Sequence, residues 1–190
     1  MIGNDIVDLK LSATESNIYR PRLQEKIFSE EERVIIRTSE NPETQLWLFW
    51  AMKEAAYKAH QRRFNLPRRF NPKDFKCRCE ISEKSELSGT VHIQGFEYFS
   101  SSKISAEYIH CIASASASAE RIYEIFSIKE KLKKELISAF SERYNFTSGA
   151  VQLLKNNYRI PQLYCDGEYL KHSFSLSHHG RFSAYVLAVN

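Results

Sequence analysis

The spacing of apolar residues changes several times along the chain, and each change predicts a different kind of element. Residues 2–9 form a short and mostly apolar segment, which predicts a strand that runs into a turn. Apolar and polar residues then alternate at a period of two across residues 75–119, a pattern typical of an antiparallel sheet. The segments 151–154, 173–177 and 182–189 are also predicted to be strands.

Capping residues mark where the helices are expected to begin. Ser29 with Glu32 forms a capping box, so a helix is predicted to start there. Asn41 followed by Pro42 supplies an N-cap and a first-turn proline for a second helix, predicted to span about residues 42–60. Another capping box, at residues 127 and 130, precedes a helix that is predicted to end near residue 144.

The combination of helices with antiparallel strands predicts an α+β fold. A stretch of alternating Ser and Ala at residues 114–118 is the best candidate for a junction. We therefore divide the chain into residues 1–119 and 120–190. At 190 residues, the whole chain is long enough to bury a sizeable core.

The composition excludes several classes of protein. Hydrophobic residues make up 43% of the chain and charged residues 26%, which is typical of globular proteins and not of disordered, collagen-like or membrane proteins. No apolar run approaches the ~20 residues of a membrane span, and no signal sequence follows Met1, so we expect a cytoplasmic protein. The four cysteines match no zinc framework and are expected to be reduced. A net charge of +4 is a mild bias toward anionic partners.

The helix predicted at residues 42–60 carries one candidate for chemistry. On a helical wheel, Glu54 and Lys58 lie one turn apart and are flanked by Trp and Tyr residues. Such pairs are common on solvated helix faces and contribute only about 0.3–0.5 kcal/mol, so this helix alone favours an ordinary surface pair. The apolar stripe of the same helix lies on another face and consists of Phe49, Met52, Ala56 and Ala59.

Two carboxylates in the first predicted strand change this balance. Asp5 and Asp8 lie in an apolar segment, where a carboxylate is costly to bury without a partner. A divalent cation would offset that cost, because carboxylates from two elements together with substrate phosphates make a typical Mg²⁺ site. Lys58 could then neutralise a departing phosphate. The alternative is that Asp5 and Asp8 cap the strand end or form a turn.

A third candidate is the Ser-Leu-Ser-His-His-Gly segment at residues 175–180, between two predicted strands. Its hydroxyls, imidazoles and glycine backbone could hold a phosphate, or the segment could be an ordinary polar turn. A zinc site at His178 and His179 is not expected, because adjacent strand residues point to opposite faces and no third ligand is evident. A Ser-His nucleophile pair lacks an orienting acid.

Taken in order, these segments resemble the 4′-phosphopantetheinyl transferase superfamily. The signatures G-x-D, W-x-x-K-E-x-x-x-K and S-x-S-H of this family are matched at residues 3–5, 50–58 and 175–178. Residues 22–32 also resemble its R-F-x-E-R-I-L-T-x-x-E segment. Any one signature is weak, but the ordered set is specific and the resemblance covers nearly the whole chain.

The resemblance implies an enzyme of the holo-[acyl-carrier-protein] synthase type, which transfers 4′-phosphopantetheine from coenzyme A to a serine of an apo acyl or peptidyl carrier protein and releases adenosine 3′,5′-bisphosphate. It implies Mg²⁺ as the cofactor, bound by Asp5 and Glu54 together with the pyrophosphate. Asp5, Glu54 and Lys58 would be catalytic, with Lys58 assisting the leaving group. The residues implied to contact coenzyme A are Lys53, Lys58, Ser177, His178 and Arg159.

Some positions depart from the family pattern. Surfactin-type members have a further carboxylate where this chain has Val7, whereas Asp8 matches an acid of the small synthase branch, so its role as a ligand is left open. The family's G-K-P aligns with residues 159–161, where only Arg159 could supply the charge of the lysine. By this resemblance, the chain has the length of two similar halves joined in permuted order. Each half would be a small antiparallel sheet packed with helices. A monomer with pseudo-twofold halves is therefore expected.

A carrier protein with an acidic helix would need a basic docking surface, for which we consider Arg20, Arg22 and Lys26, expected beside the Asp5 strand. Each could equally be a solvated helix residue. The pathway of the carrier, in fatty acid, polyketide or peptide synthesis, is left open.

Two other functions were weighed. A catalytically inactive family member would bind coenzyme A or a carrier protein without transfer. A basic module could bind nucleic acid, but this leaves Asp5 and Glu54 unexplained, so neither a nucleic-acid nor a membrane partner is expected. The residues of that basic module would be Arg62, Arg63, Phe64, Arg68, Arg69 and Phe70.

Overall fold

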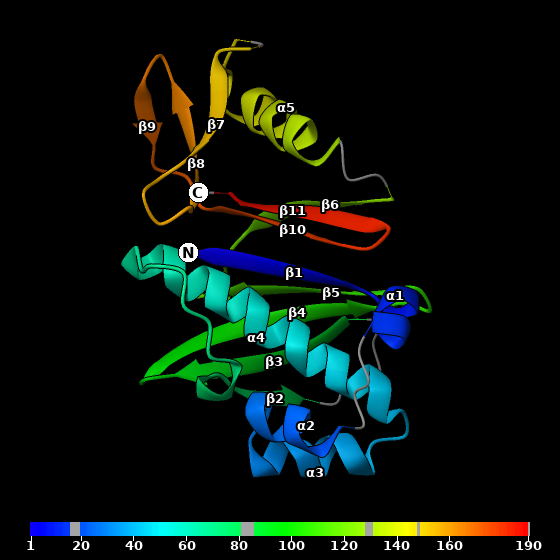
Figure 1. Cartoon of the computed structure of the whole chain (residues 1–190). Coiled ribbons are helices and arrows are strands. Elements are labelled where there is room, and N and C mark those ends of the chain that lie inside the picture. The colour runs from blue at the N-terminus through cyan, green and yellow to red at the C-terminus, as the bar shows by residue number, and fades with distance from the viewer. Residues whose placement is uncertain (16–19, 81–85, 128–130, 148, 190) are drawn as a thin grey trace.

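A computed structural model of the chain describes residues 1–15, 20–80, 86–127, 131–147 and 149–189. Figure 1 shows helices and strands stacked in layers, with the N-terminus in the middle of the molecule. None of the helices in these ranges is long and apolar enough to cross a membrane.

The helices are α1 (Leu9–Glu15), α2 (Pro21–Ile27), α3 (Glu30–Thr38), α4 (Pro42–Phe64), the 3₁₀ turn η1 (Pro72–Asp74) and α5 (Leu132–Tyr144). The strands are β1 (Ile2–Asp8), β2 (Lys76–Glu80), β3 (Glu86–Ile93), β4 (Phe96–Ile104), β5 (Tyr108–Ser114), β6 (Arg121–Phe126), β7 (Val151–Lys155), β8 (Pro161–Cys165), β9 (Glu168–Leu170), β10 (Phe174–His179) and β11 (Phe182–Ala188).

The described strands form three antiparallel sheets. One has five strands in the order β1-β5-β4-β3-β2, and the others have three each, in the orders β10-β11-β6 and β7-β8-β9. In Figure 1, α4 lies across the five-stranded sheet in the lower half, whereas α5 and the two smaller sheets make up the upper half. The α+β class with small antiparallel sheets packed with helices is thereby confirmed.

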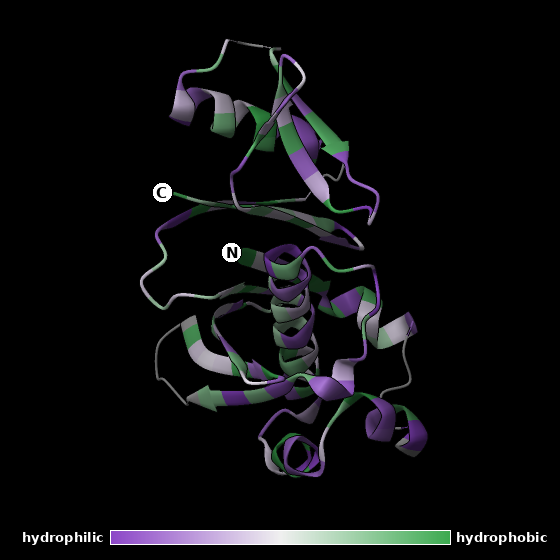
Figure 2. Cartoon of the chain, turned by 90° about the vertical axis from the view of Figure 1, so that its left-hand side faces the viewer, coloured by the Kyte–Doolittle hydropathy of each residue, from purple (hydrophilic) through white to green (hydrophobic). Residues whose placement is uncertain are grey.

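The largest core lies between α4 and the five-stranded sheet. The apolar stripe predicted on this helix, Phe49, Met52, Ala56 and Ala59, is fully buried there. A second core lies beneath α5 and includes Leu136, Phe140 and Phe174. Figure 2 looks nearly along α4 and shows it between the five-stranded sheet and the strands that lead to the C-terminus. The four cysteines are free thiols, as expected.

Capping sets the boundaries of the helices. The predicted capping box of α3 is present, with Ser29 and Glu32 each accepting a backbone N–H of the other. Asn41 caps α4, which continues beyond the expected end at residue 60 to Phe64 because the left-handed residue that stops it is Asn65, with φ 49°. The start predicted for α5 involves residues 128–130, which lie outside the described residues; the helix is described from Leu132.

Strand β1 joins two of the sheets. It pairs with β5 through its backbone, and on its other side its amides donate to side chains that flank or belong to β10. The amides of Ile2, Asn4 and Asp8 donate to Ser173 Oγ, Ser175 Oγ and His179 Nδ1, over distances of 2.9, 3.1 and 2.9 Å. The sequence separation is 171 in all three pairs, so β1 and β10 run parallel. We call this contact the β1–β10 seam.

A glycine lets β1 approach α4 closely. A Cβ atom at Gly3 would lie 2.1 Å from the carbonyl oxygen of Ala55 and 2.6 Å from the amide nitrogen of Ala59. Any side chain here would push the strand away from the helix. The glycine of the G-x-D signature therefore has a physical role, since it brings the backbone beside Asp5 within reach of side chains on α4.

Candidate active site

A cavity of about 360 Å³ lies between β1, α4 and β10. The three segments singled out in the sequence meet here: β1 contributes Asp5, α4 contributes Glu54 and Lys58, and β10 contributes Ser177 and His178. These segments are far apart along the chain and come together only because β1 packs against α4 on one side and β10 on the other. The remaining lining residues are Ile6, Val7, Trp47, Trp50, Arg68, Leu176 and His179.

Lys58 is fixed against the first strand. Its Nζ lies 2.8 Å from Asp5 Oδ1 and donates to the carbonyl oxygen of Asn4 at 2.9 Å. The side chains of Lys58 and Asp5 are 24% and 13% exposed, so the pair is only partly hydrated. The Lys58 ammonium group therefore has a fixed position at the cavity wall.

Glu54 has a strongly perturbed acidity in this cavity. Burial and, as a smaller effect, the negative charge of Asp5 raise the pKa of the Glu54 carboxyl to about 7, although Lys58 and Arg68 act in the opposite direction. Among the described residues, no hydrogen bond or ion pair to the Glu54 carboxylate is found. A partly buried carboxylate close to a second carboxylate is a group that a bound cation would stabilise.

The donor set fits Mg²⁺. Asp5 and Glu54 supply hard carboxylate oxygens from two elements into one cavity. The described residues include no group of three or more His, Cys, Asp or Glu that could hold a metal ion. Two carboxylates with substrate phosphates and water completing the shell are the usual protein environment of Mg²⁺, whereas a structural zinc site would need more ligands.

The serines of the S-x-S-H signature have different surroundings. Ser175 Oγ accepts the amide of Asn4 in the β1–β10 seam, so its role is structural. Ser177 Oγ is buried, and no partner for it is present in the described part of the chain. It lines the cavity next to the exposed His178. An unpaired buried hydroxyl facing a cavity is a hydrogen-bonding group for a ligand.

Lys53 corrects one expectation. It was expected to contact coenzyme A, but its side chain is 0% exposed and its Nζ lies 2.8 Å from Glu32 Oε2 on α3. It also donates to the carbonyl oxygens of Pro72 and Phe75. Because Lys53 and Lys58 are five residues apart, they lie on different faces of α4. Lys53 holds the helix to its structural neighbours and is not a ligand of this cavity.

Asp8 and Arg159 also lie outside the cavity. Asp8 accepts hydrogen bonds from the backbone amides of Lys10 and Leu11 and from Arg181, as the turn-forming alternative anticipated. Arg159 is exposed in the turn between β7 and β8, with φ 61°, and does not line this cavity, so its contact with coenzyme A stays a prediction.

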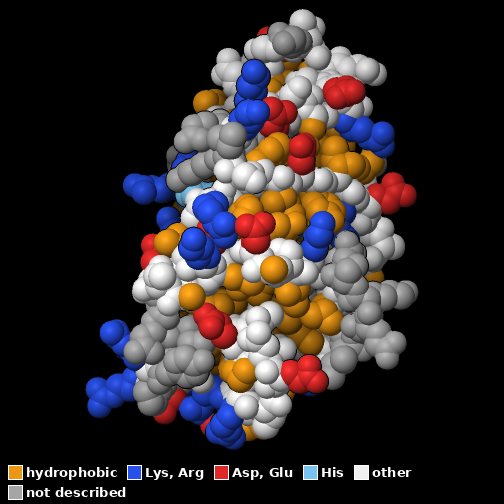
Figure 3. Space-filling view, turned by 90° about the vertical axis from the view of Figure 1, so that its right-hand side faces the viewer, with side chains coloured by type: hydrophobic (Ala, Val, Ile, Leu, Met, Phe, Trp, Pro, Cys, Tyr) orange, Lys and Arg blue, Asp and Glu red, His pale blue; other side chains and the backbone are white. Residues whose placement is uncertain are grey.

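The basic residues considered for other partners are dispersed. Arg20, Arg22 and Lys26 are exposed, but α2 lies beside α3 and packs near η1, not beside β1 as expected (Figure 1). Figure 3 shows Lys and Arg side chains projecting at that lower end of the molecule. Of the residues of the basic module, Arg68 lines the cavity, and Arg63 stacks over the rings of Phe64 and Phe96.

A second cavity, of about 340 Å³, continues along the C-terminal end of α4. Arg62 lies one helical turn beyond Lys58 and lines this cavity together with Lys171 and His172. Its guanidinium stacks over Phe174 and donates to the carbonyl oxygen of Pro161 at 3.0 Å. Burial lowers the pKa of Arg62 to about 10. No Asp or Glu is among the described lining residues, so this cavity is suited to an anion.

The sequence pattern does not predict that Arg62 and Arg68 line these cavities. It places both in a basic run instead. The spacing of Lys58 and Arg62, four residues apart on a predicted helix, was the available signal for the former. No signal of this kind existed for Arg68, because it follows the helix in an irregular segment.

One family of known proteins matches the larger, N-terminal part of the chain. The family model described as 4′-phosphopantetheinyl transferase superfamily matches residues 1–113. The matched region runs from β1 into β5 and includes Asp5, Glu54 and Lys58. No curated protein matches the chain.

Proposed function

Because this chain belongs to the 4′-phosphopantetheinyl transferase superfamily, we propose that it transfers 4′-phosphopantetheine from coenzyme A to a serine of an apo carrier protein, as a Mg²⁺-dependent synthase of holo-carrier protein. The observation that carries the proposal is the meeting of Asp5, Glu54 and Lys58 in one cavity whose opposite wall contains Ser177 and His178. Carboxylates, a fixed cation and hydroxyl donors are together the groups that bind a metal-associated pyrophosphate.

In this proposal Asp5 and Glu54 hold the ion from β1 and α4. Mg²⁺ bound there supplies positive charge that neutralises the phosphates as negative charge shifts to the leaving group. Lys58 adds a second positive charge on the same wall, and its bonds to Asp5 and to the carbonyl of Asn4 keep its ammonium in place. Ser177 and His178 bind the phosphates of the nucleotide from the β10 side.

The group transfer balances as follows. The hydroxyl oxygen of the carrier serine forms a new P–O bond to the phosphorus that bears pantetheine. The P–O bond to the other phosphate breaks, and adenosine 3′,5′-bisphosphate leaves with that bridging oxygen. The serine proton passes to a base in the cavity, either the Glu54 carboxylate or a water molecule. Catalysis then consists of positioning and charge neutralisation, as elsewhere in phosphoryl transfer.

The proposal uses side chains from both parts of the chain. Residues 1–119 supply Asp5, Glu54 and Lys58, whereas residues 120–190 supply Ser177 and His178. We therefore treat these parts as two joined halves that complete one site within a monomer. Light scattering that gives the mass of a trimer at assay concentrations would contradict this part of the proposal.

The first experiment tests the transfer itself. Coenzyme A, Mg²⁺ and an apo carrier protein are incubated with the enzyme, and the carrier is weighed by mass spectrometry. We expect a gain of one phosphopantetheine that is lost when EDTA is added in excess and restored when Mg²⁺ is returned. Binding of coenzyme A or carrier protein without any mass gain, across acyl and peptidyl carriers, would instead indicate an inactive family member.

The second cavity predicts how coenzyme A is distinguished from an analogue. Because Arg62 lies beyond Lys58 in a cavity without acidic residues, we expect it to bind the phosphate on the ribose of coenzyme A. Arg62→Ala should weaken binding of coenzyme A roughly tenfold or more while leaving binding of dephospho-coenzyme A nearly unchanged. Calorimetric titration of both ligands measures this difference. Equal losses for the two ligands would place Arg62 outside the phosphate site.

The docking surface remains a proposal that charge reversal can test. Arg22→Glu with Lys26→Glu on the exposed face of α2 is expected to raise KM for an acidic carrier protein about tenfold at low salt, with KM for coenzyme A unchanged. The matched control is reversal of Lys133 and Lys134, which are exposed on α5. If both double variants have the KM of the wild type, the carrier docks elsewhere.

A further inference from the structure

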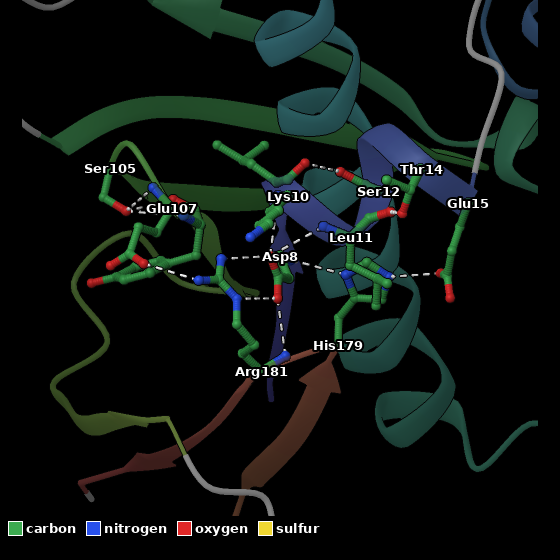
Figure 4. A network of polar contacts seen from close by, with 12 residues as sticks. Asp8, Lys10, Leu11, Ser12, Thr14, Glu15, Ser105, Glu107, His179 and Arg181 are labelled. Atoms are coloured by element: carbon green, nitrogen blue, oxygen red, sulfur yellow. Dashed lines mark hydrogen bonds and ion pairs between the residues drawn. The ribbon is translucent and has the colours of Figure 1, made fainter.

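The end of β1 contains an ion pair that the catalytic proposal does not use. Asp8 is 1% exposed, and Figure 4 shows it between donors from Arg181 and the backbone amides of Lys10 and Leu11. Its Oδ2 accepts from Arg181 Nε at 2.8 Å and from the Arg181 backbone amide at 3.0 Å, and its Oδ1 accepts from Arg181 Nη2 at 2.9 Å. Both oxygens are thus held by one arginine. The Arg181 side chain holds the pKa of Asp8 well below its usual range, so the carboxylate stays ionised.

The turn fits tightly against this carboxylate. Gly180 has φ 53°, and a Cβ atom on it would lie 2.5 Å from Asp8 Oδ2 and 2.9 Å from Leu11 Cδ2. The preceding residue, His179, accepts the Asp8 amide through Nδ1. Three consecutive residues of the turn therefore touch Asp8 or its backbone. On the outer side, Arg181 Nη1 donates to Glu107 Oε1 at 3.1 Å, where both side chains are substantially exposed.

These contacts lie next to the proposed phosphate site. Asp8 is three residues beyond Asp5 on β1, and Arg181 is three residues beyond His178 on the other wall of the cavity. The opposite end of β10 is already held by Ser173 and Ser175 in the β1–β10 seam. The end that carries His178 leads into the turn at residues 180 and 181, and there it is held to β1 by the contacts of His179 and Arg181 with Asp8.

We propose that Asp8 and Arg181 are positioning residues, which clamp the β10–β11 turn to the end of β1 and thereby hold Ser177 and His178 at the distance from Asp5 that binds the phosphates of coenzyme A. The clamp rests on the proposed function for its ligand. It acts on the second wall of the cavity and does not touch the substrate. Neither residue contributes an apolar side chain to the two cores, so removing Arg181 opens no cavity in them.

The test compares variants at Arg181. We expect Arg181→Ala to weaken coenzyme A binding about tenfold or more, because small displacements of a binding wall are costly, while KM for the carrier protein stays within about twofold. Arg181→Lys keeps the charge but loses the forked contacts, so it should recover only part of the affinity. Glu107→Gln is the matched control, since it weakens only the outer contact of the same arginine and should bind coenzyme A as the wild type does.

Hydrogen exchange provides a readout that needs no substrate. In Arg181→Ala, amides of residues 177–182 should exchange faster, while those of β1 residues 2–6 should be unchanged. Arg181→Lys serves for both measurements if the alanine variant does not fold. Unchanged exchange in the turn, or unchanged coenzyme A affinity in a folded variant, would overturn the clamp. If the wild type fails to bind coenzyme A but the variant shows the faster exchange, the proposed function fails and the clamp survives as a structural device without its assigned ligand.

Discussion

Glu54→Gln is expected to abolish carrier modification almost completely, with a loss of roughly a thousandfold or more in kcat/KM. The substitution keeps the size of the side chain but removes one of the two carboxylates that would hold the ion, and also a candidate base. The loss should persist at saturating Mg²⁺. The measurement is initial rate by mass spectrometry of the carrier, and Glu43→Gln in the first turn of α4 is the matched control outside the cavity. Retention of more than a tenth of the activity would remove Glu54 from the catalytic set.

The same variant should be more stable than the wild type in metal-free buffer at high pH. The folded-state pKa of Glu54 is raised from 4.5 to about 7, so between these values the folded state holds a proton that the unfolded state has released. Stability of the wild type therefore falls as pH rises from 4.5 through 7, and the penalty remains above 7. Glu54→Gln lacks this penalty, which amounts to at most about 3 kcal/mol.

Thermal melts with EDTA at pH 4.5 and pH 8 measure this effect. The variant and the wild type should melt at similar temperatures at the lower pH, and the variant should melt several degrees higher at pH 8. Added Mg²⁺ should raise the melting temperature of the wild type more than that of the variant. A variant that is less stable at pH 8 would show that Glu54 makes a stabilising contact when ionised.

Lys53→Met is expected to destabilise the protein by about 3–5 kcal/mol, the usual consequence of removing one partner of a buried ion pair. Methionine fills the space of the lysine stem, but Glu32 would remain buried and charged without its cation. Glu32 would keep only its contacts with the amides of Ser29 and Cys77. Two carbonyl oxygens, of Pro72 and Phe75, would also lose their donor. Urea denaturation followed by circular dichroism gives the change in the free energy of unfolding.

The matched control for Lys53→Met is Lys58→Met on the same helix. The Lys58 pair is partly exposed, so this change should alter stability by no more than about 1 kcal/mol while lowering the transfer rate strongly. The two variants should therefore show that Lys53 contributes to stability and Lys58 to catalysis. The interpretation of Lys53 would be wrong if Lys53→Met left the free energy of unfolding unchanged but weakened coenzyme A binding.

Local patterns were sufficient for many elements of the fold. The capping box of α3, the proline-initiated α4 and the alternating strands β2 to β5 were predicted because each depends on residues close together in sequence. The end of α4 was predicted too early, since the stop depends on Asn65 adopting a left-handed conformation. Patterns also marked the acids and the lysine of the first cavity, because their spacing matches the signatures of a known family.

The sequence by itself determined the α+β class, the helix that carries Glu54 and Lys58, and the carboxylate on the first strand. Only the tertiary structure decided which of two similar side chains enters the cavity. Lys53 and Lys58 differ because α3 covers one face of α4 and β1, admitted by Gly3, covers the other. Asp5 enters the cavity and Asp8 does not, because Arg181, far along the chain, binds the Asp8 carboxylate. Period and capping are local properties, whereas the partner of a charged side chain depends on contacts between distant segments.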